Sequence, residues 1–299
     1  MELQWPLILF TTFIAWSAGL FGAQGVMALI KGPDGKRGVG RKAQLPALIV
    51  SIVLLAIGGI AVFFHLQHWE RIFNGFGHIT SGITQELIAI VVFALVAVIF
   101  FVMLRRAEEP GTVPAWVAVC AIVISVVLAF VCGHSYMMAS RPAWDTLLEA
   151  LSVMGAAFIT GPATMAFIMA VRGDDCTPAG KPVLIGAIIG AILVLIYAIY
   201  LQTSGGSYVD VGYYYDPTSP TEGMTDVTGA IADVAPLLWI GGFVVGGVLP
   251  VVLAIVAKVK NRPVLWKVLS LLIVICGFAG AIVLRMAFYE LGFSIFLLY

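Results

Sequence analysis

Charged residues are scarce in this sequence. They make up 11% of the 299 residues, whereas 61% are hydrophobic and the mean hydropathy is +1.07. A soluble domain of ordinary composition has about 25% charged residues. Apolar stretches of about 20 residues, long enough to cross a hydrocarbon core of roughly 30 Å, recur along the chain. The scarcity of charge therefore excludes a soluble domain and indicates a multi-pass membrane protein.

Cysteine is also scarce, and the common catalytic motifs are missing. The four cysteines are scattered and show no C-x-x-C spacing for zinc or an iron–sulfur cluster: Cys120, Cys132, Cys176 and Cys276. The sequence contains no Walker motif, no glycine-rich dinucleotide loop and no nucleophile elbow. In GGFVVGG, Gly241 to Gly247, glycines recur at four-residue spacing, which favours close helix packing. We therefore expect no metal site and no iron–sulfur cluster in this chain.

The apolar stretches lack the polar alternation of a transmembrane barrel, so they predict helices. We expect an all-α, polytopic transmembrane helical bundle that forms a single membrane-embedded domain over residues 1–299. The first stretch lacks a basic n-region and exceeds the length of a signal-peptide core, so we expect it to be retained. The eight predicted spans lie near residues 5–30, 44–65, 86–104, 115–133, 147–171, 182–202, 235–257 and 265–289.

Basic residues gather in the loops that follow the odd-numbered spans. These loops contain or adjoin 13 of the 16 Lys and Arg residues: Lys31, Lys36, Arg37, Arg41, Lys42, Arg105, Arg106, Arg172, Lys181, Lys258, Lys260, Arg262 and Lys267. Under the positive-inside rule, loops enriched in this way are cytoplasmic. We therefore predict that both termini and the even-numbered loops lie on the outer side of the membrane.

All four histidines are predicted to lie at the outer membrane boundary. His65 ends the second span, His68 and His78 follow it, and His134 ends the fourth span. Six further ionisable residues fall at the same level: Arg71, Arg141, Asp145, Glu149, Arg285 and Glu290. Ionisable groups at membrane depth are costly, so such a cluster favours a functional site that faces the bundle interior. The alternative is that interfacial His and Arg side chains only anchor the helix ends.

Three motifs, in the right order, resemble the membrane anchor subunit of dimethyl sulfoxide reductase. HLQHWERIFN (65–74) and the later SGITQE are similar to the family's second-loop signature, His-Leu-Gly-x-Pro-x-Arg followed by Ser and Glu. SYMMASRPAWDT (135–146) resembles the family's stretch after the fourth span, and RMAFYELG (285–292) resembles its Arg-x-x-Phe-Tyr end. The sequence departs from the pattern at Gln67 and Trp69, where glycine and proline are usual.

The resemblance implies a membrane anchor that binds and oxidises menaquinol during anaerobic respiration. The electrons would pass to a four-cluster iron–sulfur subunit and from there to a molybdopterin catalytic subunit. The resemblance also implies the cytoplasmic membrane of a bacterium. The chain would then carry the quinol-oxidising site of the complex but no haem or iron–sulfur cluster. Its other expected partner is the lipid bilayer, and we expect no nucleic acid.

Oxidation of a quinol needs a group that accepts the hydroxyl proton. A neutral histidine suits this task because its unperturbed pKa is about 6.5. We therefore assign proton acceptance to His65 and charge stabilisation to Arg71, with Arg141 as the alternative. Outward proton transfer is assigned to Glu86, for which Asp145 and Glu149 are alternatives. Acids in a first helical turn can also simply complement the helix dipole. The expected quinol-binding residues are His65, His68, Arg71, His134, Tyr136, Arg141, Trp144, Asp145 and Arg285.

Two other functions remain open. In a b-type cytochrome anchor, His65 and His134 would supply one pair of haem ligands, and histidines near only one face allow at most one haem. A secondary transporter would have internal repeats and charges at the span centres. The span centres of this sequence are nearly free of ionisable residues, which favours the quinol-oxidising anchor.

Residues 202–236 are predicted to form a long outer loop. This segment has five acids, no basic residue and three consecutive tyrosines. Exposed tyrosines are favoured interface residues, and acids can steer a basic partner. Because this loop and the histidines share one face, we expect the iron–sulfur subunit to dock there.

Overall fold

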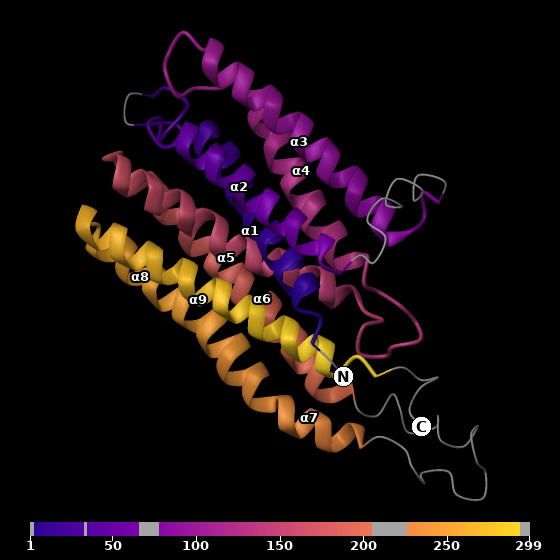
Figure 1. Ribbon diagram of the computed structural model, residues 1–299. Helices are drawn as coiled ribbons and strands as arrows, with labels where there is room; N and C mark the ends of the chain where they lie inside the picture. The colour runs from indigo at the N-terminus through magenta and orange to yellow at the C-terminus, as the bar shows by residue number, and fades with distance from the viewer. Residues whose placement is uncertain (1–2, 33–34, 66–77, 205–225, 294–299) are drawn as a thin grey trace, which may run out of the picture.

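The computed structural model describes residues 3–32, 35–65, 78–204 and 226–293. Apart from an isolated bridge between Lys31 and Arg37, the regular structure in these ranges is helical. Eight helical segments in the described part of the chain are long and apolar enough to cross a membrane. They run side by side as a bundle (Figure 1). The predicted all-α bundle of eight spans is therefore confirmed.

Most predicted spans agree with the observed helices to within a few residues. The bundle contains α1 (Trp5–Leu29), α2 (Gln44–Phe63), α3 (Gly82–Arg106), α4 (Ala115–His134), α5 (Leu147–Arg172), η2 (Thr177–Ala179), α6 (Gly180–Thr203), α7 (Val227–Pro236), η5 (Leu237–Val248), α8 (Leu249–Lys260) and α9 (Pro263–Glu290). The short η2 continues into α6, and α7, η5 and α8 together form the seventh spanning segment.

The seventh segment begins earlier than the sequence predicts, because residues 227–236 are helical rather than part of a loop. Asp226 explains where α7 starts: its carboxylate accepts a hydrogen bond from the Gly229 N–H at 2.8 Å, as an N-cap does. The helix continues past Pro236 as η5, which has the wider turn of a π-helix. The prediction of a loop is therefore wrong for 227–236, and residues 205–225 lie outside the described part of the chain.

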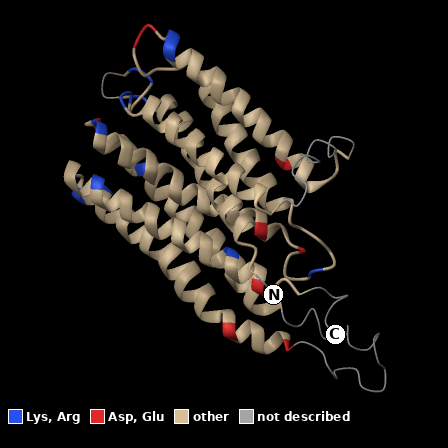
Figure 2. Ribbon diagram, viewed as in Figure 1, with Lys and Arg blue, Asp and Glu red and all other residues tan. Residues whose placement is uncertain are grey.

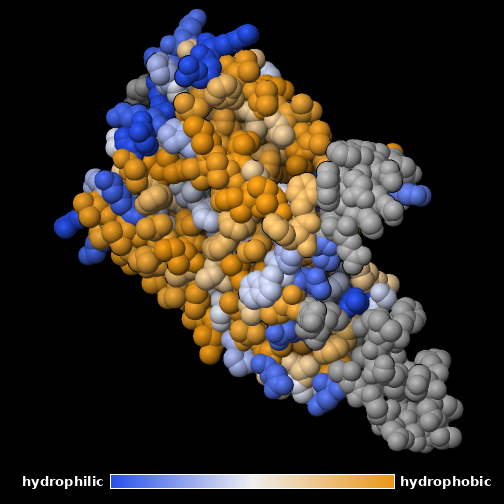
Figure 3. All heavy atoms as spheres, in the orientation of Figure 1, coloured by the Kyte–Doolittle hydropathy of each residue, from blue (hydrophilic) through white to orange (hydrophobic). Residues whose placement is uncertain are grey.

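The helices α1 and α5 form the centre of the bundle and are its most buried spans. The helix α1 packs against α2, α4 and α5, while α5 also packs against α6 and α9. Gly161 of α5 lies against Gly19 of α1, where a side chain at either position would clash with the other helix. Many Ile, Val and Leu side chains on the outside of the bundle stay exposed (Figure 3), as lipid contact requires.

The glycines of η5 lie in helix contacts. A Cβ atom added to Gly246 would lie 2.8 Å from the Cα atom of Gly280 in α9, and Gly247 faces Ala191 of α6. Such close approach between backbones is what small residues allow in membrane helices. The expectation that GGFVVGG serves helix packing is therefore confirmed.

The two ends of the bundle differ in charge (Figure 2). One end, here called the basic end, carries most of the Lys and Arg residues and is made by the segments at 30–32, 35–43, 105–114, 172–181 and 258–267. At this end, Glu109 forms ion pairs with Lys36 at 2.6 Å and with Arg41 at 2.7 Å. The opposite end, here called the acidic end, is made by the last residues of α2, α4, α6 and α9 and the first residues of α1, α3, α5 and α7. The positive-inside rule predicts that the basic end is cytoplasmic.

Candidate functional site

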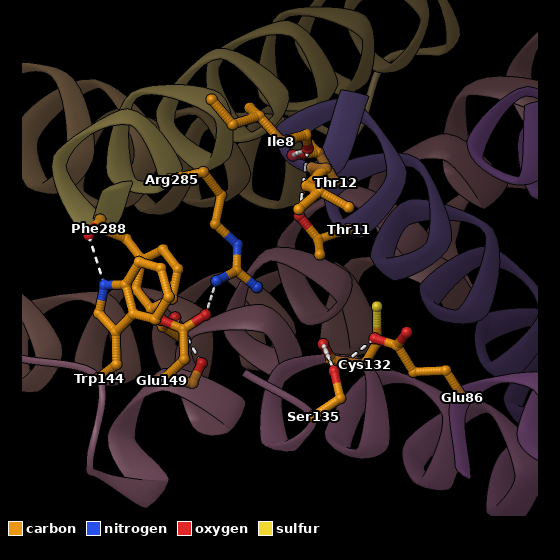
Figure 4. Close-up of polar contacts among 12 residues, drawn as sticks. Ile8, Thr11, Thr12, Glu86, Cys132, Ser135, Trp144, Glu149, Arg285 and Phe288 are labelled. Carbon is orange, nitrogen blue, oxygen red and sulfur yellow. Dashed lines mark hydrogen bonds and ion pairs between the residues drawn. The ribbon is translucent and has the colours of Figure 1, made fainter. Parts of the chain in front are cut away.

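A buried ion pair joins α5 and α9 near the acidic end. Glu149 lies in the first turn of α5, and Arg285 lies in the last part of α9. Their side chains are 0% and 7% exposed, and the guanidinium group contacts the carboxylate directly (Figure 4). Thr146 caps α5 by accepting a hydrogen bond from the Leu148 N–H at 3.2 Å. The cap and the negative charge of Glu149 both suit a helix N-terminus.

A second buried carboxyl group lies near this pair. Glu86 of α3 is 8% exposed, and its Oε1 accepts a hydrogen bond from the Ser135 hydroxyl at 2.5 Å. Figure 4 shows Glu86, Ser135 and Cys132 on one side of Arg285, with Glu149 on the other. The charge of Arg285 acts on Glu86 as well. The acidic end therefore buries two carboxyl groups and one guanidinium group within the bundle.

An aromatic wall borders the ion pair. The rings of Trp144 and Phe288 stack with their centroids 4.3 Å apart, and the Trp144 Nε1 donates a hydrogen bond to the Phe288 carbonyl at 2.7 Å. The Arg141 Cζ lies 4.6 Å from the Trp144 ring centroid, and the Arg141 guanidinium also donates to the Gly292 carbonyl. A side chain at Gly292 would clash with Trp144. These contacts hold the segment after α4 against the end of α9.

Tyr136 lies beside the same cluster, just after α4. Burial raises the pKa of its hydroxyl well above the ordinary value of 10.0, and the Glu86 carboxyl raises it further, while Arg285 acts in the opposite direction. The Arg285 Cζ lies 5.8 Å from the Tyr136 ring centroid and 5.2 Å from that of Phe288. Tyr136 therefore stays a neutral hydroxyl at working pH, able to donate and accept hydrogen bonds.

The ion pair has unused hydrogen-bonding capacity. Glu149 Oε2 and Arg285 Nη2 are buried and have no hydrogen-bond partner among the described residues. A cavity of about 20 Å³ borders Arg285, Thr11, Thr12 and other residues of the bundle interior. This volume fits one water molecule, which needs at least about 10–15 Å³, but it is too small for a quinol ring.

The structure brings together some of the predicted quinol-binding residues and separates others. Tyr136, Arg141, Trp144 and Arg285 form one connected group with Glu86, joined through the Phe288 ring. His134 is half-buried at the end of α4, where its ring stacks on Phe130 with the centroids 5.7 Å apart and its Nδ1 lies 3.1 Å from the Met137 sulfur. Three further ionisable residues lie exposed at the acidic end: His65, His78 and Asp145.

The sequence predicts that His65 faces the bundle interior, but in the structure its side chain is exposed. It follows Phe64 at the end of α2, and both side chains are exposed. The helix α2 packs mainly on α1, which leaves much of its surface outside the bundle. His65 is thus open to a molecule that approaches from the lipid or from the acidic end. His68 and Arg71 lie outside the described residues.

Sequence reasoning underrated two of the clustered residues. The sequence predicts Glu149 only as an alternative proton carrier, and its spacing from Thr146 fits a capping box. In the structure its side chain instead pairs with Arg285. Ser135 is uncharged, so the sequence did not indicate it, although its hydroxyl donates a hydrogen bond to Glu86. The sequence did contain a signal for the ion pair, because Glu149 and Arg285 carry opposite charges at the same predicted membrane level in different spans.

The fold and the site together define a class of protein: a multi-pass membrane subunit with a buried ionisable cluster near one end of its helical bundle. No curated protein sequence matches the chain significantly. The family model described as DMSO reductase anchor subunit (DmsC) matches residues 1–291, so the chain belongs to that family. It is therefore the membrane anchor of a DMSO-reductase-type complex, and the family implies catalytic and iron–sulfur partner subunits.

Proposed function

We propose that this chain oxidises menaquinol at the acidic end of its bundle and delivers the electrons to an iron–sulfur subunit docked there. That subunit would feed a molybdopterin catalytic subunit during anaerobic respiration, in the cytoplasmic membrane of a bacterium. Neither haem nor an iron–sulfur cluster is needed in the anchor, because the quinol is the electron donor and the partner holds the clusters.

One observation carries this proposal: the acidic end buries Glu149, Arg285 and Glu86 in a bundle that is otherwise poor in charge. Removing ions from water costs several kcal/mol per ion, and replacing a buried pair with apolar residues is often neutral or stabilising. Packing alone therefore does not explain why three ionisable residues are buried here. Intramembrane ionisable groups typically mark proton or substrate pathways.

The positions of the residues suit the release of two protons from a quinol. His65 is exposed at the end of α2, where its imidazole would accept the proton of one ring hydroxyl. The Glu86 carboxylate already accepts a hydrogen bond from the Ser135 hydroxyl. The proton of the other ring hydroxyl would pass to Glu86, with Ser135 as a relay. Arg285 places a positive charge beside Glu86, which favours negative charge on the quinol oxygen as its proton leaves.

The same end is suited to docking of the iron–sulfur subunit. Asp226 and Asp233 are exposed at and within α7, close in sequence to the segment that carries the other acids and the three tyrosines. A negative surface would steer a basic partner toward this face. Electrons would then travel only from the rim of the bundle to the partner, without crossing the membrane.

A charge-neutral substitution of Glu86 tests the proposal in the assembled three-subunit complex. In Glu86→Gln, oxidation of a reduced menaquinol analogue should fall by about 10²- to 10⁴-fold, the usual contribution of a positioned acid–base group. Reduction of the terminal acceptor by an artificial donor, which bypasses the anchor, should stay normal. The control is Glu108→Gln, the same change at an exposed acid of the basic end. Normal quinol oxidation in Glu86→Gln would contradict the role of this cluster.

A further inference from the structure

A groove runs along the outside of the bundle at the basic end. Its wider part has a volume of about 720 Å³ and continues into a narrower apolar part of about 100 Å³ nearer the middle of the membrane. Four residues line both parts and so connect them: Val26, Phe158, Pro162 and Pro182. The groove therefore extends from the membrane boundary toward the bundle interior.

The shape of the groove follows from helix packing. Its floor is formed by α1 and α5, which pack directly against each other, while α4 and α6 flank it and pack on α5. Gly19 and Gly22 have no side chains to project from α1 into the groove, and the rings of Pro162 and Pro182 do not fill it. The exposed Ile185 of α6 forms part of one wall. The result is a slot whose inner part is lined mainly by apolar residues.

The mouth of the groove carries positive charge. Lys31, at the end of α1, and Lys181, in the first turn of α6, both line it and are exposed. Neither ammonium group forms an ion pair with another described residue. Among the described residues that line the mouth, Asp175 is the one acid, and it leaves the mouth with a net positive charge. Its Oδ1 accepts hydrogen bonds from the Thr177 N–H at 2.9 Å and from the Thr177 hydroxyl at 2.7 Å.

We propose that this groove binds an anionic phospholipid from the leaflet at the basic end. The phosphate would lie between Lys31 and Lys181, and one acyl chain would lie along Gly22 and Phe158. Basic pockets between transmembrane helices are suited to anionic head groups. A zwitterionic lipid would place its own cation next to the two ammonium groups, and a quinone has no charge for them to neutralise. Charge complementarity at the mouth therefore selects the anionic lipid.

The first test removes the charge at the mouth. The intact complex is purified in detergent with added phosphatidylglycerol or phosphatidylcholine, and native mass spectrometry measures the lipid retained on the anchor. Each lysine should contribute about fivefold to the retention of phosphatidylglycerol, so Lys31→Gln/Lys181→Gln should lower it about 20- to 30-fold. Retention of phosphatidylcholine should hardly change. Lys260→Gln/Lys267→Gln, at the same end but outside the groove, is the control and should behave like the wild type.

The second test fills the slot and leaves the charges in place. Ile185→Trp should displace the bound lipid, whereas Ile199→Trp, an exposed residue of α6 outside the groove, should retain it. Equal retention of phosphatidylglycerol in the double lysine variant and the wild type would overturn the proposal. So would the loss of a co-purifying quinone, rather than phospholipid, from Ile185→Trp. Neither result would bear on quinol oxidation at the acidic end.

Discussion

Glu149 and Arg285 form an ion pair that is almost completely buried between α5 and α9. The pair lies between the aromatic wall of Trp144 and Phe288 and the second carboxyl group, Glu86 (Figure 4). If Glu149, Arg285 and Glu86 were all ionised, the cluster would carry one net negative charge. Binding a single proton would then make it neutral, which accounts for one of the two protons that a quinol releases on oxidation.

Removing one member of the ion pair should destabilise the anchor strongly. Glu149→Gln leaves the guanidinium group of Arg285 buried without a counter-charge, a change that typically costs about 3–5 kcal/mol. Thermal unfolding of the purified complex in detergent should therefore begin at a clearly lower temperature. Asp145→Asn provides the control, since Asp145 is exposed two residues before α5.

The double variant Glu149→Leu/Arg285→Met should regain most of that stability, because no charge is then left unpaired. Its quinol oxidation should nevertheless be low, since the positive charge beside Glu86 is missing. If the double variant oxidises quinol normally, the pair has only a structural role.

Contact between η5 and α9 depends on glycine. A Cβ atom at Gly280 would lie 2.2 Å from the Gly246 Cα, so Gly280→Ala should cost about 1–3 kcal/mol through overpacking. Gly59→Ala in α2 meets nothing within 4 Å and should be neutral or slightly stabilising, because alanine has the higher helix propensity. Thermal unfolding of both variants measures the difference, and equal melting temperatures would refute the close helix contact.

The ion pairs of Glu109 should make the basic end sensitive to acid. Hydrogen bonds from Lys36 and then from Arg41 hold the pKa of Glu109 below its ordinary value of 4.5. A carboxyl group with a lowered pKa stabilises the fold at neutral pH, and this contribution is lost as the pH falls below 4.5 through the folded-state pKa. The protection factors of the Gly38 and Val39 amides, which donate hydrogen bonds to Ile30 and Met27, should therefore fall at low pH in the wild type but not in Glu109→Gln. The same pH response in both proteins would exclude Glu109 as the cause.

The positions of the spans were predictable because the length and apolarity of each segment are local properties. The seventh span was the exception. Acids, glycines and Pro236 suggested a loop, but Asp226 caps a helix and η5 continues past the proline. The placement of the described ionisable residues at one end of the bundle was also predictable from their positions in the spans.

The partners within the site were not predictable in the same way. The pairing of Glu149 with Arg285 depends on α5 lying beside α9, and the sequence does not state which spans are neighbours. The hydrogen bond from Ser135 to Glu86 likewise depends on the contact between α3 and α4. The exposure of His65 follows from the peripheral position of α2, which no local pattern reveals.

The most direct test of the central claim is the rate of menaquinol oxidation by the assembled complex carrying His65→Ala. His78→Ala is a matched control, because both histidines are exposed at the acidic end. Without the imidazole, the first quinol proton has no acceptor, so the rate should fall by about 10²- to 10⁴-fold. His78→Ala should keep the wild-type rate, and both variants should keep normal activity with an artificial donor. Wild-type quinol oxidation in His65→Ala would contradict the proposed proton acceptor, and loss of both activities together would show that His65 is structural.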